Sequence, residues 1–129
     1  MKVLALDYGA ARTGVAVSDA TGTLARPVGV VRRAASEDGL ARIVALVEEH
    51  AAERVVVGLP LTLRGERGAQ AAETERFVSA LRALLSVPVE TYDERFTTAL
   101  AAREGGGRAD EDARAAAHLL SGYLERLSG

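Results

Sequence analysis

Residues 3–7 constrain the fold more than any other stretch of the chain. They form an unbroken apolar run that ends in the carboxylate of Asp7 and is followed by Tyr8 and Gly9. Such a run, bounded by a turn signal and without polar alternation, indicates a strand buried on both faces of a sheet. Because an ionised carboxylate is costly to desolvate, we expect Asp7 to be paired, hydrogen-bonded or bound to a cation.

The composition is that of a small soluble domain. With 129 residues, of which 48% are hydrophobic and 26% charged, the chain is expected to form a single domain over residues 1–129. It has no cysteine, which excludes disulfides, thiolate metal sites and a cysteine nucleophile. No segment approaches the length of a membrane span, and no signal sequence precedes the first strand. We therefore expect a cytoplasmic protein without a membrane partner.

The charge is unevenly distributed along the sequence. The formal net charge is −2, but the basic residues of segment 1–35 outnumber its two acids, Asp7 and Asp19. This asymmetry allows a local basic face and argues against a general polyanion binder. All basic side chains except Lys2 are arginines. Their planar forks suit bidentate phosphate contacts, although a GC-rich genome would produce the same bias.

Three strands are expected first, at residues 3–7, 13–18 and 28–31. The five-residue link between the first two indicates a hairpin, so these strands should be antiparallel. Pro27 places the start of the third strand at an irregularity or at a sheet edge.

Helices alternate with strands in the rest of the chain. Amphipathic helices are predicted from Ser36 to His50, over residues 70–85 and over residues 110–127, with short strands at 54–58 and 87–92. Ser36 is the expected N-cap of the first helix, and a further short helix is expected to start at Thr97 or Thr98. The connection between the third and fourth strands is long enough for a parallel crossover. The predicted inner helix faces consist of Leu40, Ile43, Val44 and Val47, then Phe77, Val78, Leu81, Leu84 and Leu85, and then Ala116, Leu119, Leu120, Tyr123 and Leu127.

Acidic residues stand at the ends of three of these elements. Asp7 ends the first strand, Asp93 and Glu94 end the fifth, and Asp112 opens the last helix. The spacing from Asp112 to Ala116 and the later apolar residues places this acid on the core-facing stripe. Taken alone, Asp112 is more simply interpreted as an acidic residue at the helix N-terminus, with Asp110 or Asp112 as the cap.

A helix packed on a sheet can bring its N-terminus beside the C-terminal strand ends, so these acids could converge. Converging carboxylates repel one another unless a divalent metal ion neutralises them, and hard oxygen ligands suit Mg²⁺ or Mn²⁺. A pair of such ions about 4 Å apart can activate water and stabilise the leaving oxygen in phosphodiester cleavage. The spacing supports a nuclease hypothesis, although it does not establish that the acids converge.

Four ordered motifs carry a family resemblance over nearly the whole chain. They are residues 6–19, residues 57–61 with Gly65, Gly68 and Gln70, residues 93–98 with Ala101, and Asp112 with Ala115, Ala116, Leu120, Tyr123 and Leu124. Together they resemble the YqgF/RuvX family, described as Holliday junction resolvases and as nucleases that mature small-subunit ribosomal RNA. The resemblance implies an α/β, RNase H-like fold. Its five-stranded mixed sheet, flanked by helices, has three antiparallel strands first and parallel strands later.

The resemblance also implies metal-dependent phosphodiester hydrolysis, with Mg²⁺ or Mn²⁺ as cofactor. Asp7, Glu94 and Asp112 are the implied catalytic carboxylates and metal ligands. Asp93 is a further catalytic candidate that could instead orient a neighbour or cap the following helix. The implied partner is nucleic acid, either a ribosomal RNA precursor or branched DNA. The ribosome is a further partner that the resemblance implies. The chain could act as a monomer or a homodimer.

Five residues are candidates for substrate binding. Arg12 and Arg95 lie beside the acids in sequence and could hold phosphate or stabilise transition-state charge. The alternative is a salt bridge to a neighbouring acid, equally expected for Arg95 and less so for Arg12. In the loop after the fourth strand, Thr62, Arg64 and Arg67 could contact the nucleic-acid backbone or be incidental. Thr62 and Arg64 stand where the family usually has Asn and Asp. This departure from the family pattern affects the expected contacts between the loop and the substrate.

Structural roles are expected for the other polar and aromatic residues that stand out in the sequence. We expect His50 to interact with its helix terminus and His118 to lie at a rim or on the surface. Packing is the default role for Tyr8 and Tyr92, although both could stack a base. Asp19 is expected to close the turn after the second strand.

Two other classes of function remain open. The first motif also resembles the phosphate loop of sugar kinases, actin and chaperone ATPases, but those proteins enclose a nucleotide between two such lobes. A binding-only module on nucleic acid or ribosomes is the other alternative, because similar domains occur in larger transcription factors without the full acid set. The presence of all the acids here favours an enzyme.

Overall fold

The computed structural model describes residues 1–59, 68–93 and 109–128. These residues form β1 (Val3–Asp7), β2 (Arg12–Ser18), β3 (Ala25–Arg32), α1 (Glu37–Glu49), β4 (Arg54–Leu59), α2 (Ala69–Leu84), β5 (Val89–Asp93) and α4 (Ala109–Ser128). The short helix predicted to start at Thr97 or Thr98 lies outside the described residues. None of the described helices is long and apolar enough to cross a membrane.

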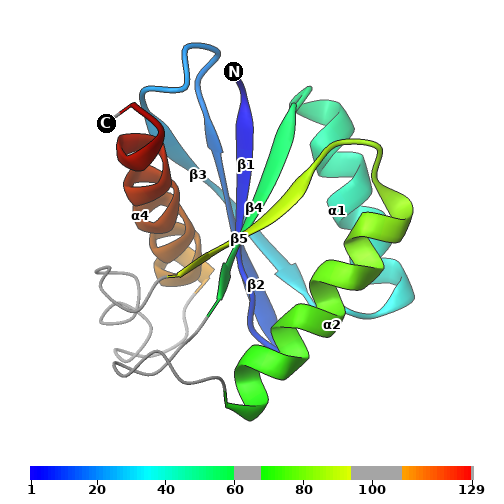
Figure 1. Cartoon of the computed structure of the whole chain (residues 1–129). Helices are drawn as coiled ribbons and strands as arrows, with labels where there is room; N and C mark the ends of the chain where they lie inside the picture. The colour runs from blue at the N-terminus through cyan, green and yellow to red at the C-terminus, as the bar shows by residue number, and fades with distance from the viewer. Residues whose placement is uncertain (60–67, 94–108, 129) are drawn as a thin grey trace.

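The strands form one mixed sheet in the order β3-β2-β1-β4-β5 (Figure 1). β2 pairs antiparallel with both β1 and β3. β4 pairs parallel with both β1 and β5. This arrangement confirms the predicted five-stranded sheet with three antiparallel strands first and parallel strands later.

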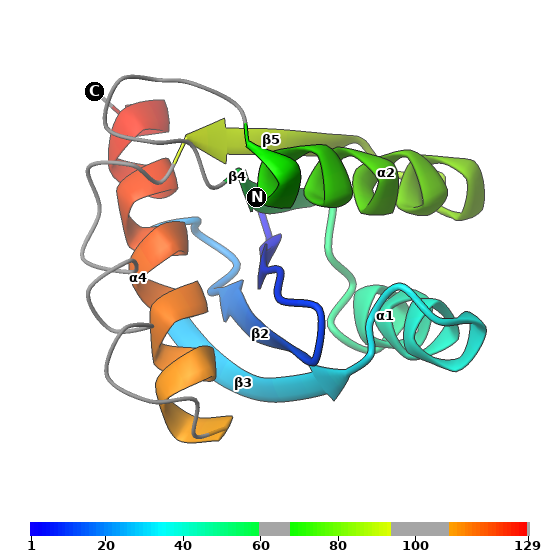
Figure 2. The same ribbon diagram turned by 90° about the horizontal axis from the view of Figure 1, so that it is seen from below.

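Helices cover both faces of the sheet, α1 and α2 on one side and α4 on the other (Figure 2). Because successive side chains of a strand point to opposite faces, β1 contributes to two cores. Leu4 and Leu6 belong to the core beneath α1 and α2. Val3 and Ala5 belong to the core beneath α4. All five residues of β1 are buried, as predicted for a strand covered on both faces.

Local signals in the sequence explain several element boundaries. The Ser36 hydroxyl accepts a hydrogen bond from the Gly39 amide at 3.1 Å, which confirms the predicted N-cap of α1, and His50 is its C-cap. Pro27 lies on the edge strand β3, as expected, but within the strand, which begins at Ala25. The register between β2 and β3 shifts between Val15 and Ala16, so the ladder of these two strands contains a bulge at this point.

The predicted inner helix faces are correct except for Val44, which is half-buried outside the core, and for residues near the helix ends. Leu84 is 55% exposed and Leu127 is 50% exposed, so both predictions of inward-facing residues were wrong. Each lies in the last turn of its helix, and Leu85 packs against the core in place of Leu84. In α1 the buried set includes Leu46, which the predicted stripe omitted.

Candidate active site

Asp7 lies at the C-terminal end of β1 and is 3% exposed. Alternation along β1 places its side chain on the α4 face, together with Val3 and Ala5. Its antiparallel partner on β2 is Gly14. Asp7 therefore lies within the sheet at the face that α4 covers.

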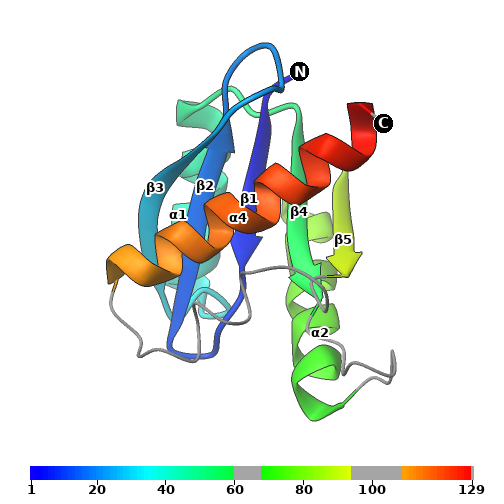
Figure 3. The ribbon, with the colours of Figure 1, turned by 90° about the vertical axis from the view of Figure 1, so that its left-hand side faces the viewer.

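Gly14 allows α4 to approach this strand pair. A Cβ atom on Gly14 would lie 1.9 Å from the main-chain oxygen of Asp112 and 2.5 Å from its carbonyl carbon. The first turns of α4 thus rest directly on the backbone of β2, and the helix then runs obliquely across the sheet toward β4 and β5 (Figure 3). Asp7 and Asp112 are brought to the same glycine, one from the neighbouring strand and one from the helix above.

The Asp112 carboxylate contacts Arg12. Asp112 Oδ2 lies 3.2 Å from Arg12 Nε, and the two side chains are 16% and 30% exposed. The same oxygen is buried and accepts no hydrogen bond within the part of the chain that the structure describes. The guanidinium therefore neutralises Asp112 without an aligned hydrogen bond. This salt bridge is the alternative that the sequence made less expected for Arg12.

Asp93 reaches the same edge of the sheet from β5. It pairs with Leu59 of β4, while Leu6 of β1 lies beside Val57 of β4. β1 and β5 are two strand spacings apart, about 10 Å. Tyr92 packs on the α4 side of the sheet. Alternation therefore assigns Asp93 to the opposite face from Asp7.

The other predicted site residues lie outside the described part of the chain. They are Glu94, Arg95, Thr62, Arg64 and Arg67. Within residues 1–59, 68–93 and 109–128, no three acidic, histidine or cysteine side chains form a group that could hold a metal ion.

Arg32 is a residue that the sequence analysis missed. It pairs directly with Arg12 across β2 and β3, and it is exposed. Directly paired residues share a face, so Arg12 and Arg32 both belong to the α4 side of the sheet. Like charges on directly paired residues repel, and a bound anion would relieve that repulsion. The signal that could have identified Arg32 is the register between β2 and β3. The bulge near Ala16 makes this register difficult to predict from the sequence.

The remaining candidates have structural roles. Tyr8 is buried, stacks on Phe77 with ring centroids 4.5 Å apart, and donates a hydrogen bond to Glu73. Burial, with a smaller contribution from Glu73, raises the pKa of the Tyr8 hydroxyl. Packing is thus the confirmed role of Tyr8. His118 is exposed on α4, as predicted.

Asp19 closes the turn after β2, as predicted. Its carboxylate accepts hydrogen bonds from the Thr21 hydroxyl and from the amides of Thr23 and Leu24. These bonds lower the pKa of Asp19, with the Thr21 hydroxyl as the largest cause. The turn therefore accounts for this acid without a catalytic role.

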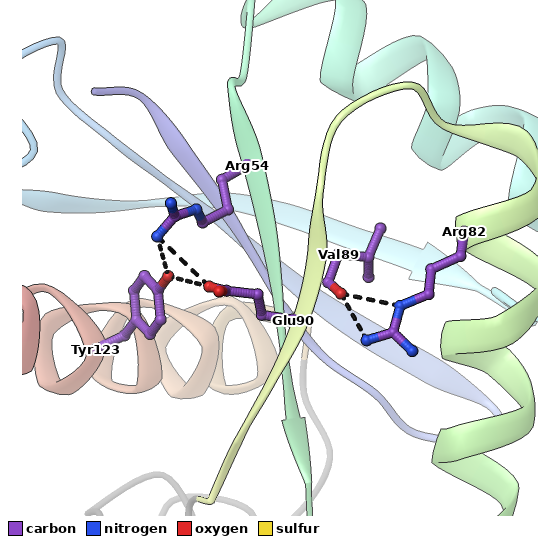
Figure 4. A network of polar contacts seen from close by, with 5 residues as sticks. All are labelled: Arg54, Arg82, Val89, Glu90 and Tyr123. Carbon is purple, nitrogen blue, oxygen red and sulfur yellow. Dashed lines mark hydrogen bonds and ion pairs between the residues drawn. The ribbon is translucent and has the colours of Figure 1, made fainter.

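A second polar cluster anchors the other end of α4 (Figure 4). Tyr123 donates a hydrogen bond to Glu90 and accepts one from Arg54 at 2.8 Å, while Arg54 and Glu90 form an ion pair at 3.5 Å. Burial raises the pKa of Tyr123, and the bond to Glu90 raises it further. On the opposite face of the sheet, Arg82 of α2 donates two bonds to the Val89 carbonyl. The Tyr123 cluster ties α4 to β4 and β5, and so fixes the helix that carries Asp112.

Comparison with known proteins agrees with the family resemblance. The model of the family described as "RuvX: Holliday junction resolvase" matches residues 1–126. A Chloroflexus aurantiacus protein named "Putative pre-16S rRNA nuclease" is 44% identical, with 95% of this chain and 86% of that protein covered. A Desulforudis audaxviator protein of the same name is 40% identical, with 100% and 98% covered.

Two solved structures share the fold. One is T. thermophilus RuvC in complex with a Holliday junction substrate, with a TM-score of 0.61 and 21% identity, covering 100% of this chain and 96% of that one. The other is the Fowlpox virus resolvase in complex with Holliday junction DNA, with a TM-score of 0.61 and 11% identity, covering 100% of both chains. These likenesses confirm the predicted fold class.

Proposed function

Because the chain belongs to the RuvX family of Holliday junction resolvases, we propose that it is a metal-dependent endonuclease that cleaves structured nucleic acid in the cytoplasm. The relatives' name supports pre-16S rRNA as a substrate, and we place the cleavage at its 5′ end, in ribosome biogenesis. The family description supports a four-way DNA junction. The observation that carries the proposal is the approach of Asp7 and Asp112 to one glycine, Gly14, at one edge of the sheet.

The donor set fits a divalent cation. Both acids offer hard oxygen ligands of the kind that Mg²⁺ and Mn²⁺ prefer. Asp112 Oδ2 is buried without a hydrogen bond from any described residue, which leaves that oxygen available as a ligand. We assign Asp7 and Asp112 as ligands, with Glu94 as the third. Glu94 is preferred to Asp93 because Asp93 belongs to the opposite face of β5.

The protein's own contribution is a rigid, charged frame for the phosphodiester. Asp7 is held in a strand buried on both faces, and Asp112 is held by a helix seated on Gly14, so both carboxylates are preorganised. When bound, the cation supplies activation of water and neutralisation of charge at the cleaved phosphate. Arg12 contacts Asp112, Arg32 is paired with Arg12 across β2 and β3, and both orient substrate phosphates. Arg95, Thr62, Arg64 and Arg67 remain proposed substrate contacts.

The proposal is tested by cleavage of labelled substrates. Purified protein is incubated with four-way DNA junctions and with a pre-16S rRNA fragment, in Mg²⁺ or Mn²⁺ and then with excess chelator. We expect discrete products that disappear with chelator and return when metal is restored. Binding without cleavage under every metal condition would favour the binding-only module. Tight binding of a free nucleotide would instead favour the alternative related to sugar kinases.

Arg32 is expected to contribute to substrate binding. Because it is exposed and stands opposite Arg12, Arg32→Gln should weaken nucleic-acid binding about three- to tenfold and reduce the salt slope by about one. Binding is measured by fluorescence anisotropy in chelator over a range of salt concentrations. Arg26→Gln is the matched control, because Arg26 is an exposed arginine near the opposite end of β3. Equal weakening by the two substitutions would contradict a local phosphate contact at Arg32.

A further inference from the structure

We propose that Arg12 is a displaceable counter-ion. In the free protein it supplies the positive charge that Asp112 requires, and a divalent cation that binds Asp112 takes its place. This inference rests on the proposed function, in which Asp112 is a metal ligand. It goes further by stating that the protein itself competes with its metal through one named side chain.

The contact between the two side chains has the features of an exchangeable pair. Oδ2 of Asp112 is buried, and its cationic partner among the described residues is Arg12, with Nε at 3.2 Å. A permanent structural pair typically uses aligned, bidentate hydrogen bonds. Here the contact is through one nitrogen and is not aligned, since the oxygen accepts no hydrogen bond from the described residues. Arg12 is also 30% exposed, so its head group can turn into solvent without unpacking the core.

The backbone that carries the Asp112 carboxylate, in contrast, is fixed. Gly14 receives the main chain of Asp112 at a distance that no side chain would permit, so the first turns of α4 cannot slide along β2. Because Oδ2 of Asp112 is buried on a backbone that cannot shift, it must keep a cation nearby. When one cation replaces the other, the arginine is therefore the partner that moves.

Arg32 is the second arginine that takes part in the proposed exchange. It is paired with Arg12 across the strands, on the same face. While Arg12 neutralises Asp112, the two arginines carry one excess charge beside the acid. Once a divalent cation neutralises Asp112, both guanidinium groups are available to one phosphate. Cation binding and phosphate binding should consequently reinforce each other, as thermodynamic linkage requires of sites that share one group.

The test is a direct measurement of metal affinity without nucleic acid. Isothermal titration with Mn²⁺ is carried out on the wild type and on Arg12→Gln, Arg12→Lys and Arg26→Gln. Because the competing charge is removed, Arg12→Gln should bind Mn²⁺ about tenfold more tightly. Arg12→Lys keeps the charge and should remain within about threefold of the wild type. Arg26→Gln removes a distant charge and should change the affinity less than twofold.

A double-substitution cycle assigns the effect to the pair. In an Asp112→Asn background, Arg12→Gln should give no gain in Mn²⁺ affinity, because its partner is absent. Circular dichroism and urea unfolding establish that each variant is folded. Unchanged or weaker Mn²⁺ binding by Arg12→Gln, or the absence of Mn²⁺ binding in all variants, would overturn the proposal. Metal-dependent cleavage by the wild type would still support the nuclease function in that event, so the two failures are distinguishable.

Discussion

Replacing Asp7 by Asn is expected to lower the rate of cleavage at least a hundredfold while leaving nucleic-acid binding intact. Asn has nearly the same shape, so a side chain that is 3% exposed can be exchanged without opening a cavity. It lacks the negative charge that holds a hard divalent cation. Changes in the outer shell of metal sites alone cost roughly 10- to 100-fold in affinity or activity, so the loss of a direct ligand should cost more. Single-turnover cleavage and anisotropy measure the two effects separately.

A matched aspartate provides the control for this experiment. Asp19 is exposed, and its carboxylate closes a surface turn after β2. Asp19→Asn is therefore expected to leave the cleavage rate within about twofold of the wild type. Undiminished cleavage by an Asp7→Asn preparation free of contaminating nuclease would reject Asp7 as a catalytic residue. Parallel loss of cleavage and of binding would show that Asp7 maintains the fold rather than the chemistry.

The Asp7 experiment also separates the classes of function. A nuclease loses turnover and keeps its substrate when a metal ligand is neutralised. A binding-only module has no turnover to lose, and its affinity should change little or rise, because a negative charge near the nucleic-acid backbone has been removed. Turnover, rather than affinity, therefore separates the two classes of function.

Periodicity in the sequence predicted the described elements because each signal is local. The run at residues 3–7, the hairpin that follows it and the helical spacing of Phe77, Val78 and Leu81 each depend on neighbours within a few positions. Leu84 and Leu127 were mispredicted for the same reason. A helical stripe does not reveal where the sheet beneath it ends, and both residues lie in terminal turns.

The candidate site was only partly predictable because it depends on contacts between distant segments. Asp7 and Asp112 were identified as acids at the ends of elements, which is a local property. Their common neighbour, Gly14, reads in the sequence as an ordinary strand residue. The signal for Arg32, its register with Arg12, was hidden because the β2–β3 ladder contains a bulge. The ion pair between Arg12 and Asp112 likewise joins residues one hundred positions apart in the chain.

Of all additions of a single methyl group in the described part of the site, Gly14→Ala is expected to be the most disruptive. The added Cβ would lie 1.9 Å from the carbonyl oxygen of Asp112, and backbone atoms on both sides cannot rotate away. α4 must then move off β2. Overpacking of this kind typically costs about 1–3 kcal/mol, occasionally more, and should appear as a lower urea midpoint. The cleavage rate should fall by about a hundredfold even where the variant is fully folded, because a displacement of about 1 Å at a catalytic group has that effect.

Gly29→Ala separates the specific clash from the general effect of adding a methyl group to a strand. Gly29 lies on β3, and a Cβ there would meet nothing within 4 Å. This substitution should be neutral or slightly stabilising, by up to about 1 kcal/mol, because it restricts the unfolded chain. If Gly14→Ala matched Gly29→Ala in urea midpoint and cleavage rate, α4 would not rest on β2 at Asp112. The position of Asp112 beside Asp7 would then lose its structural cause, since the approach of α4 to Gly14 is what brings the second acid to the end of β1.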